Sequence, residues 1–280
     1  MADRPEHVEG RLAGVGDVEL FWQAWLPPGP PTGVVLICHG LGEHSGRYGH
    51  VVDALVPAGW AVYGLDLRGH GRSAGRRVHL ARYGDWLADL DTFRRFVAAR
   101  HDGLPVFLLG HSMGGQIALA YALDHQADLR GLVLSAPALA SNAVPDAVVP
   151  VLMTLARFAP TLRPAGIDAS KISKDPDVYA AYRADPLVHL GNPTLGLSSA
   201  LYTQFGVLPE RARDLRLPVL LQYGELDGIT DPRGFRALEA ACGAPDFTVH
   251  RYPGLWHEIY NEPERDHPLT DLKDWLTAHN

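Results

Sequence analysis

The sequence predicts an α/β protein in which helices flank a mostly parallel central sheet, and three observations support this fold class. Short apolar segments alternate with amphipathic segments along most of the 280 residues. The apolar segments are rich in β-branched and aromatic residues on both faces, as the buried strands of parallel sheets are. One long interval interrupts this alternation. Strands that alternate with helices form a parallel sheet covered on both faces.

The predicted strands comprise a hairpin followed by six buried strands. Residues 18–26 alternate in polarity, and the turn-forming residues 14–17 can fold them back onto residues 8–12 as a hairpin. The six apolar segments are residues 34–38, 60–65, 106–109, 131–135, 219–223 and 247–252. Because amphipathic segments separate these six, we expect them to run parallel to one another.

Four segments are predicted as helices. They are residues 83–100, 113–123, 232–242 and 269–278. The first shows the pattern most clearly, because Trp86, Leu90 and Phe93 recur at spacings of three and four with polar residues opposite them. These helices fill the intervals between the predicted strands, as crossover connections do.

The long interval covers residues 136–217, far more than one crossover connection needs. Within it, residues 147–159 are mostly apolar and lie between Pro145 and Pro160. This run is either an extra core helix or part of a cap over a binding site, and the absence of an evident strand favours the cap. The predicted domains are therefore a core, residues 1–137 and 206–280, and a cap, residues 138–205.

Composition excludes several classes of protein. Lys and Arg number 25 against 32 Asp and Glu, and no basic tract is present, which excludes an electrostatic nucleic-acid binder. Two cysteines, Cys38 and Cys242, form no disulfide framework and indicate a reducing compartment. Residues 1–7 lack the apolar segment of a signal peptide, and no apolar run approaches the length of a transmembrane helix. We therefore expect a cytoplasmic protein.

Ser112 is the predicted nucleophile. Two segments match G-x-S-x-G, residues 71–75 and 110–114, but only the second follows an apolar strand and leads directly into a predicted helix. A sharp turn there holds serine in a strained backbone conformation at a helix N-terminus, where N–H groups favour developing negative charge. Ser73, in the first segment, lacks this setting and is interpreted as a loop serine.

The predicted base is His257 and the predicted acid is Asp227. In parallel sheets reactive groups gather where strands end, and His257 follows the last predicted strand. His39 also follows a strand, but we interpret it as a buried residue that shapes its loop. Asp227 follows the strand before; Asp231 is interpreted as a helix N-cap, and Glu225 is a weaker rival. The resulting order of serine, aspartate and histidine is that of the α/β-hydrolases.

The backbone N–H groups of Leu41 and Met113 are the predicted oxyanion donors. Met113 follows the nucleophile, and Leu41 lies in a glycine-containing loop after an early strand. The same loop continues to Glu43 and Arg47, which can hydrogen-bond a hydroxylated leaving group. Their alternative role is a surface ion pair, and the sequence leaves this choice open.

Several motifs together resemble the monoacylglycerol lipase family of serine α/β-hydrolases, and they are most similar to those of actinobacterial members. They are HGLGEHSGRY at residues 39–48, DLRGHGRS at 66–73, GHSMGG at 110–115, SAPA at 135–138, DPLV at 185–188 and YPGLWHE at 252–258. The resemblance runs from about residue 25 to the C-terminus. It implies an α/β-hydrolase fold with a helical cap, and hydrolysis of a monoacylglycerol to fatty acid and glycerol through an acyl-Ser112 intermediate.

The resemblance also implies roles for individual residues. Glu43 and Arg47 would hold the glycerol hydroxyls, and the cap would be a mobile lid whose apolar rim contacts lipid aggregates. Animal members place a second histidine three residues after the catalytic one, whereas this chain has Tyr260. That departure leaves the polar end of the glycerol pocket and the preference between positional isomers open.

Alternatives remain on the same scaffold. A carboxylesterase, lysophospholipase or peptide or imide hydrolase would share the triad, and a lipid-binding module could retain the fold without turnover. The apolar run, with Leu152, Leu155 and Phe158, can lie at a membrane interface, pack in the core or form a homodimer. Neither a cofactor nor a metal is expected, because serine acyl transfer requires none.

Overall fold

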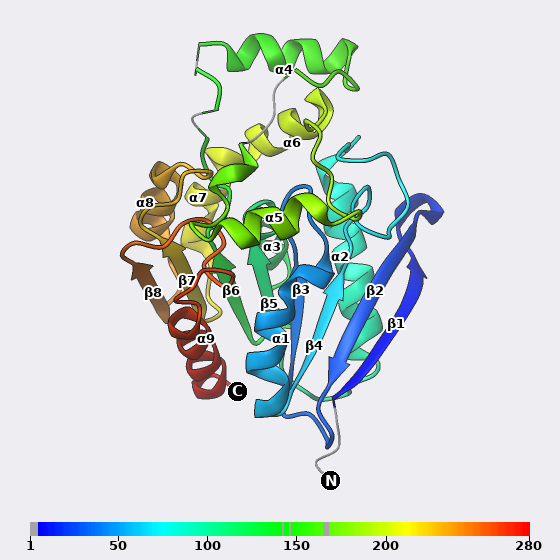
Figure 1. The fold of residues 1–280 in the computed structure, drawn as a ribbon, viewed down its shortest axis with the longest axis vertical. Coiled ribbons are helices and arrows are strands. Elements are labelled where there is room, and N and C mark those ends of the chain that lie inside the picture. The colour runs from blue at the N-terminus through cyan, green and yellow to red at the C-terminus, as the bar shows by residue number, and fades with distance from the viewer. Residues whose placement is uncertain (1–4, 142, 146, 165–167) are drawn as a thin grey trace.

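One sheet organises the part of the chain that the computed structural model describes, residues 5–141, 143–145, 147–164 and 168–280. Eight described strands pair in the order β1-β2-β4-β3-β5-β6-β7-β8 (Figure 1). Their bounds are β1 Glu6–Ala13, β2 Glu19–Leu26, β3 Gly33–Cys38, β4 Trp60–Leu65, β5 Val106–His111, β6 Gly131–Ser135, β7 Val219–Gly224 and β8 Phe247–Tyr252. All predicted strands are confirmed, and the α/β-hydrolase fold with them.

The sheet is antiparallel at one edge and parallel elsewhere. β1 and β2 form the predicted hairpin, with Leu12 opposite Leu20, and β2 pairs antiparallel with β4. Strands β3 to β8 are parallel, so their carboxyl ends meet at one edge of the sheet. Loops that follow these strands are therefore brought together there.

Helices cover both faces, as the pattern predicted. α1 and α9 pack on the face that includes Val35 and Ile37, while α2, α3 and α8 pack on the face that includes Val34 and Leu36. The bounds are α1 Gly49–Leu55, α2 Tyr83–Ala98, α3 Met113–Asp124, α8 Pro232–Ala241 and α9 Asp266–Ala278. The sequence missed α1, which is short and begins with glycine. α9 begins three residues earlier than predicted, because Pro268 is tolerated in a first helical turn.

The long interval between β6 and β7 carries further helices. They are α4 Val149–Phe158, α5 Pro176–Ala184, α6 Leu195–Phe205 and α7 Val207–Arg211. Figure 1 shows α4 farthest from the sheet, above α6, and Ala156 is its one buried residue. The interpretation of residues 147–159 as an extra core helix is therefore wrong. Residues 142, 146 and 165–167 of this interval, like residues 1–4, lie outside the described residues.

Membrane-spanning helices are not found in the described residues, since none of their helices is long and apolar enough to cross a bilayer.

The turn from β5 into α3 packs directly against the end of β3. A Cβ atom on Gly114 would lie 2.0 Å from the carbonyl oxygen of Cys38, and one on Gly110 would lie 2.4 Å from the carbonyl oxygen of Gly114. Both distances are far below a van der Waals contact. The contacted atoms belong to the backbone, which cannot easily move aside. Glycine at these positions is thus a steric requirement for bringing the helix against the sheet.

We predict that Gly114→Ala lowers the free energy of unfolding by about 3 kcal/mol or more, because the new methyl group displaces the backbone of β3. Gly84→Ala in α2 is the matched control, since no atom lies within 4 Å of its Cβ position. That change should leave stability unchanged or raise it by up to about 1 kcal/mol. Urea unfolding measures both, and equal effects of the two variants would contradict the close approach of α3 to β3.

Candidate active site

Ser112 lies at the sharp turn between β5 and α3, with φ 54° and ψ −119°. Its backbone is held from both sides. The Ser112 N–H donates to the carbonyl oxygen of Ser135 at 2.9 Å, and its own carbonyl accepts from the N–H of Ala138 at 2.9 Å. The side-chain hydroxyl has no hydrogen-bond partner among the described residues. The predicted strain is confirmed, and the hydroxyl is left available.

Ser73, in the other G-x-S-x-G segment, has a different environment. Its hydroxyl is fully buried, accepts from the N–H of Phe21 at 2.8 Å and donates to the carbonyl oxygen of Asp66. This serine ties its loop to β2, and its interpretation as a loop residue is confirmed.

His257 and Asp227 meet at the carboxyl edge of the sheet. The ring Nδ1–H of His257 donates to Asp227 Oδ2 at 2.8 Å, and the two side chains are 5% and 1% exposed. Asp227 also accepts from the backbone N–H groups of Ile229 and Thr230 and from the Thr230 hydroxyl. Three hydrogen-bond donors therefore hold the Asp227 carboxylate in place, in addition to the imidazole that it orients.

The charges of this pair stabilise each other. Burial of the His257 ring opposes its protonation, but the adjacent Asp227 carboxylate outweighs burial and raises the pKa of His257 above 6.5. Burial likewise opposes ionisation of Asp227, yet the imidazole and the Thr230 hydroxyl hold its pKa below the usual value. The pair thus suits a histidine that accepts a proton while its aspartate stays ionised.

The rival residues have structural roles. Asp231 caps α8 by accepting from the N–H of Arg233 at 2.9 Å, as predicted. His39 is fully buried, its Nδ1 bonds the carbonyl oxygen of Gly40 at 2.8 Å, and its Nε2 accepts from the N–H of Leu67 at 3.0 Å. Both side chains are therefore occupied away from Ser112, and the interpretation of His39 is confirmed. Glu225 is exposed.

Leu41 and Met113 line one cavity together with Ser112. Neither backbone N–H donates to another described residue, so both remain available to an oxyanion. The loop of Leu41 is held by Glu43, whose Oε1 accepts from the N–H of Gly40 at 2.6 Å and from the Tyr48 hydroxyl at 2.9 Å. The shape of this loop therefore depends on a buried carboxylate.

Glu43 and Arg47 form an ion pair, but a buried one. Arg47 Nη1 lies 2.9 Å from Glu43 Oε2, and the side chains are 10% and 6% exposed, so the surface alternative is wrong. Arg47 also makes a bidentate pair with Glu258, at 2.6 and 2.8 Å. Because Glu258 directly follows His257, this network joins the loop of Leu41 to the loop of His257. Sequence reasoning missed Glu258, and its position beside the histidine was the available signal.

The two carboxylates change the ionisation of this network. Burial opposes the charge of Glu43, but Arg47 reverses that effect and lowers the pKa of Glu43. Burial likewise opposes the Arg47 cation, and the Glu258 carboxylate outweighs it to raise the pKa of Arg47. The hydroxyl of Tyr260, which the sequence analysis noted as a departure from the family pattern, donates to Gln222 Oε1 at 2.6 Å inside the core.

Two cavities meet at Ser112 and share Leu41, Pro193 and Ile229. The larger, of about 1060 Å³, lies under the helices of the long interval and opens to solvent. Its lining is mainly apolar and includes Val149, Leu152, Met153, Leu195, Leu201 and Phe205. The smaller, of about 660 Å³, has a more polar lining, in which Glu43, His111, Tyr182, His189, His257 and Glu258 lie beside apolar side chains. A ligand in which one bond joins an apolar group to a polar group can therefore place the apolar group in the larger cavity and the polar group in the smaller one.

Leu152 lies in different surroundings from Leu155 and Phe158. The sequence grouped Leu152 with Leu155 and Phe158 and left their surroundings open, and the structure separates them, because Leu152 lines the apolar cavity. Phe158 is 83% exposed and Leu155 41%. Helix α4 is apolar on two sides because it covers a cavity with one of them.

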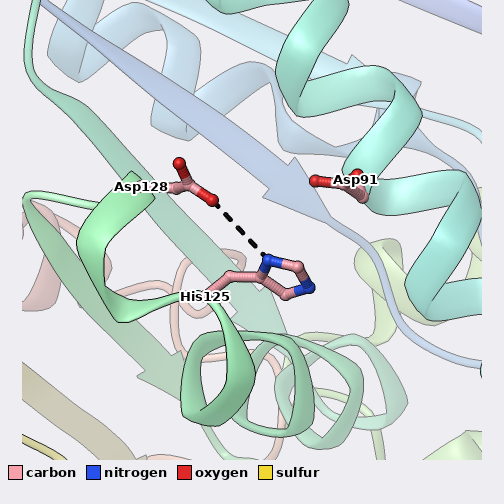
Figure 2. Close-up of side chains that lie close together, drawn as sticks. All are labelled: Asp91, His125 and Asp128. Atoms are coloured by element: carbon pink, nitrogen blue, oxygen red, sulfur yellow. Dashed lines mark ion pairs between the residues drawn. The ribbon is translucent and has the colours of Figure 1, made fainter.

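A separate cluster, Asp91, His125 and Asp128, has ligand atoms within 4.8 Å of one another (Figure 2). His125 Nδ1 lies 3.6 Å from Asp128 Oδ2. Arg94 and Arg95 lie 3.4 and 2.8 Å from the Asp91 carboxylate. These guanidinium groups already supply the positive charge a metal would bring, so the geometry fits an ion-pair network.

Comparisons with known proteins agree with this geometry. Residues 29–264 match the family model described as serine aminopeptidase, S33. The chain is 40% identical to a monoacylglycerol lipase of Mycolicibacterium smegmatis over 277 residues, 99% of this chain and 98% of that protein. It is 31% identical to human monoglyceride lipase over 245 residues, 87% of this chain and 81% of that protein.

A solved structure shows the same likeness in three dimensions. The monoacylglycerol lipase of Paleococcus ferrophilus superposes with a TM-score of 0.83 at 32% identity, covering 98% of this chain and 100% of that one. Sequence and structure thus match over essentially the whole chain. The chain belongs to the monoacylglycerol lipase family of serine α/β-hydrolases.

Proposed function

We propose that this protein hydrolyses monoacylglycerols to fatty acid and glycerol. The observation that carries the proposal is the position of Ser112 where an apolar and a polar cavity meet. The scissile ester of a monoacylglycerol likewise joins one acyl chain to a hydroxylated head group. Family membership supports the same substrate class.

In the proposed mechanism Ser112, His257 and Asp227 form the catalytic triad. His257 Nε2 accepts the hydroxyl proton as Ser112 Oγ attacks the ester carbonyl, while Asp227 holds the ring through Nδ1. The N–H groups of Leu41 and Met113 stabilise the oxyanion. His257 then gives the proton to the departing glycerol oxygen, and water hydrolyses the acyl-serine by the same steps.

The domains around the triad and the residues on the glycerol side are assigned as follows. We assign residues 138–205 to a cap over a core of residues 1–137 and 206–280. Glu43 lines the polar cavity and is assigned to the glycerol side, whereas Arg47 lies behind it against Glu258. Arg47 therefore acts on the glycerol through Glu43 rather than by direct contact.

We predict that Ser112→Ala abolishes release of fatty acid from monoacylglycerol, lowering kcat by about 10⁴-fold or more. Monoacylglycerol, diacylglycerol and triacylglycerol are assayed side by side with this variant as the blank. Release from the monoester alone is expected, because a second acyl chain would have to enter the cavity on the head-group side, which is the smaller and more polar of the two. Equal release from all three would favour a broad carboxylesterase, and lipid binding without release would favour a non-catalytic module.

We predict that kcat/KM falls as the pH drops through the pKa of His257, with a midpoint above 6.5, because only the neutral ring accepts the serine proton. Asp227→Asn removes the charge that raises this pKa, so the midpoint should move to lower pH while the plateau falls by about 10²-fold or more. Asp231→Asn is the matched control and should leave the midpoint unchanged. A midpoint that moves with Asp231 instead would reassign the acid.

We further propose that the cap docks on a lipid surface and makes the protein peripherally membrane-associated. The docking face is defined by Val148, Val151, Leu155, Phe158 and Leu162, all exposed. Residues 147–164 carry Arg157 and Arg163 and no acidic residue, in a chain whose net charge is −7. The Arg163 guanidinium bonds the carbonyl oxygens of Asn192 and Arg77, which leaves Arg157 as the cation beside the docking face. An apolar face with a neighbouring cation complements an anionic bilayer.

We predict that Val151→Ser with Phe158→Ser weakens binding to anionic phospholipid vesicles by about tenfold or more, since both side chains lose contact with the acyl region. Val207→Ser, an exposed valine outside the docking face, should have no effect. Co-sedimentation measures binding, and sedimentation velocity without vesicles reports dimerisation. Unchanged vesicle binding, with a dimer that the double variant dissolves, would assign this face to a second copy of the chain.

A further inference from the structure

The segment between α5 and α6 crosses the loop that carries Leu41. The backbone N–H of His189 donates to the carbonyl oxygen of Gly42 at 2.8 Å. Gly42 has φ 78°, and a Cβ atom there would lie 3.0 Å from the carbonyl oxygen of His189. This part of the cap is therefore seated directly against the loop beside Ser112, and the backbone of His189 is held close to the nucleophile.

The side chain of His189 lines the polar cavity together with Ser112 and His257. Its Nε2 is screened from solvent and has no hydrogen-bond partner among the described residues. Room for the ring depends on Gly191, where a Cβ atom would lie 2.7 Å from that nitrogen. A buried polar atom without a partner is unfavourable, so a ligand that supplies the partner would be favoured at this position.

The ring is suited to a neutral hydroxylated ligand. Burial, together with Arg163 and Arg77, lowers the pKa of His189, so the imidazole is neutral near pH 7. A neutral imidazole offers one donor and one acceptor nitrogen. An alcohol hydroxyl complements either nitrogen, because it can both donate and accept.

We propose that His189 is a specificity-determining residue whose ring hydrogen-bonds a free hydroxyl of the glycerol head group when the ester lies at Ser112. The inference rests on the proposed function, because it assigns one contact within that reaction. It concerns the alcohol side only, since His189 does not line the apolar cavity. An ester with no free hydroxyl would gain nothing from this contact.

The test compares a monoacylglycerol with the ethyl ester of the same fatty acid, which lacks the hydroxyls. His189→Leu should lower kcat/KM for the monoacylglycerol by about tenfold and leave that for the ethyl ester within about twofold. His189→Gln should restore most of the activity, because its amide can replace the hydrogen bond. His267→Leu, the same replacement at an exposed histidine of α9 that lines neither cavity, is the control and should change neither substrate.

Each other result overturns the inference. An equal loss on both esters would mean that the ring only supports the loop of Gly42, and no loss on either would mean that the ring contacts no substrate. The proposed function fails in a different way, namely if the wild-type protein itself releases no fatty acid from monoacylglycerol. Wild-type turnover with an unchanged His189→Leu variant would overturn the inference alone.

Discussion

The strained backbone at Ser112 is the constraint on which the rest of the site depends. A non-glycine residue at φ 54° costs about 1–3 kcal/mol, and it persists only where its surroundings hold it. Here the hydrogen bonds to Ser135 and Ala138 and the close approach of Gly114 to β3 do so. The same approach puts the N-terminus of α3, with the Met113 N–H, beside the loop of Leu41. The proposed nucleophile and both proposed oxyanion donors are thus positioned by one packing contact.

A buried charge network connects the other parts. Arg47 lies between Glu43 and Glu258, and its guanidinium also lies 4.6 Å from the centre of the Tyr182 ring on α5. The loop of Leu41, the loop of His257 and helix α5 therefore meet at the Arg47 guanidinium. Two carboxylates around one guanidinium leave a net negative charge near His257, which adds to the effect of Asp227 on its pKa. Loss of either carboxylate would leave unbalanced charge in a dry environment, which makes this network intolerant of partial change.

Sequence patterns predicted the sheet, the turn at Ser112 and the pair of Asp227 and His257. Each of these is marked by a short local pattern, in which a buried strand is followed by a loop at its carboxyl end. Contacts between distant segments left no such signal. Glu258 meets Arg47 across 211 positions of the chain, and His189 reaches the polar cavity only because the cap folds back over Gly42. The sequence left the surroundings of Leu152 open for a related reason. A helix that is apolar on two sides gives no periodicity that distinguishes the cavity from the solvent.

Helix α4 shows how the cap and its surroundings are linked. Its inner side, at Leu152 and Met153, faces a cavity that an acyl chain can fill, and its outer side leaves Phe158 83% exposed. Neither apolar side is fully covered by protein, so an acyl chain in the cavity and an apolar surface against the outer face would each stabilise the position of α4. The triad supplies chemistry common to many ester hydrolases. We therefore expect discrimination among their substrates to depend on the proposed cap, whose helices α4 and α6 line the apolar cavity.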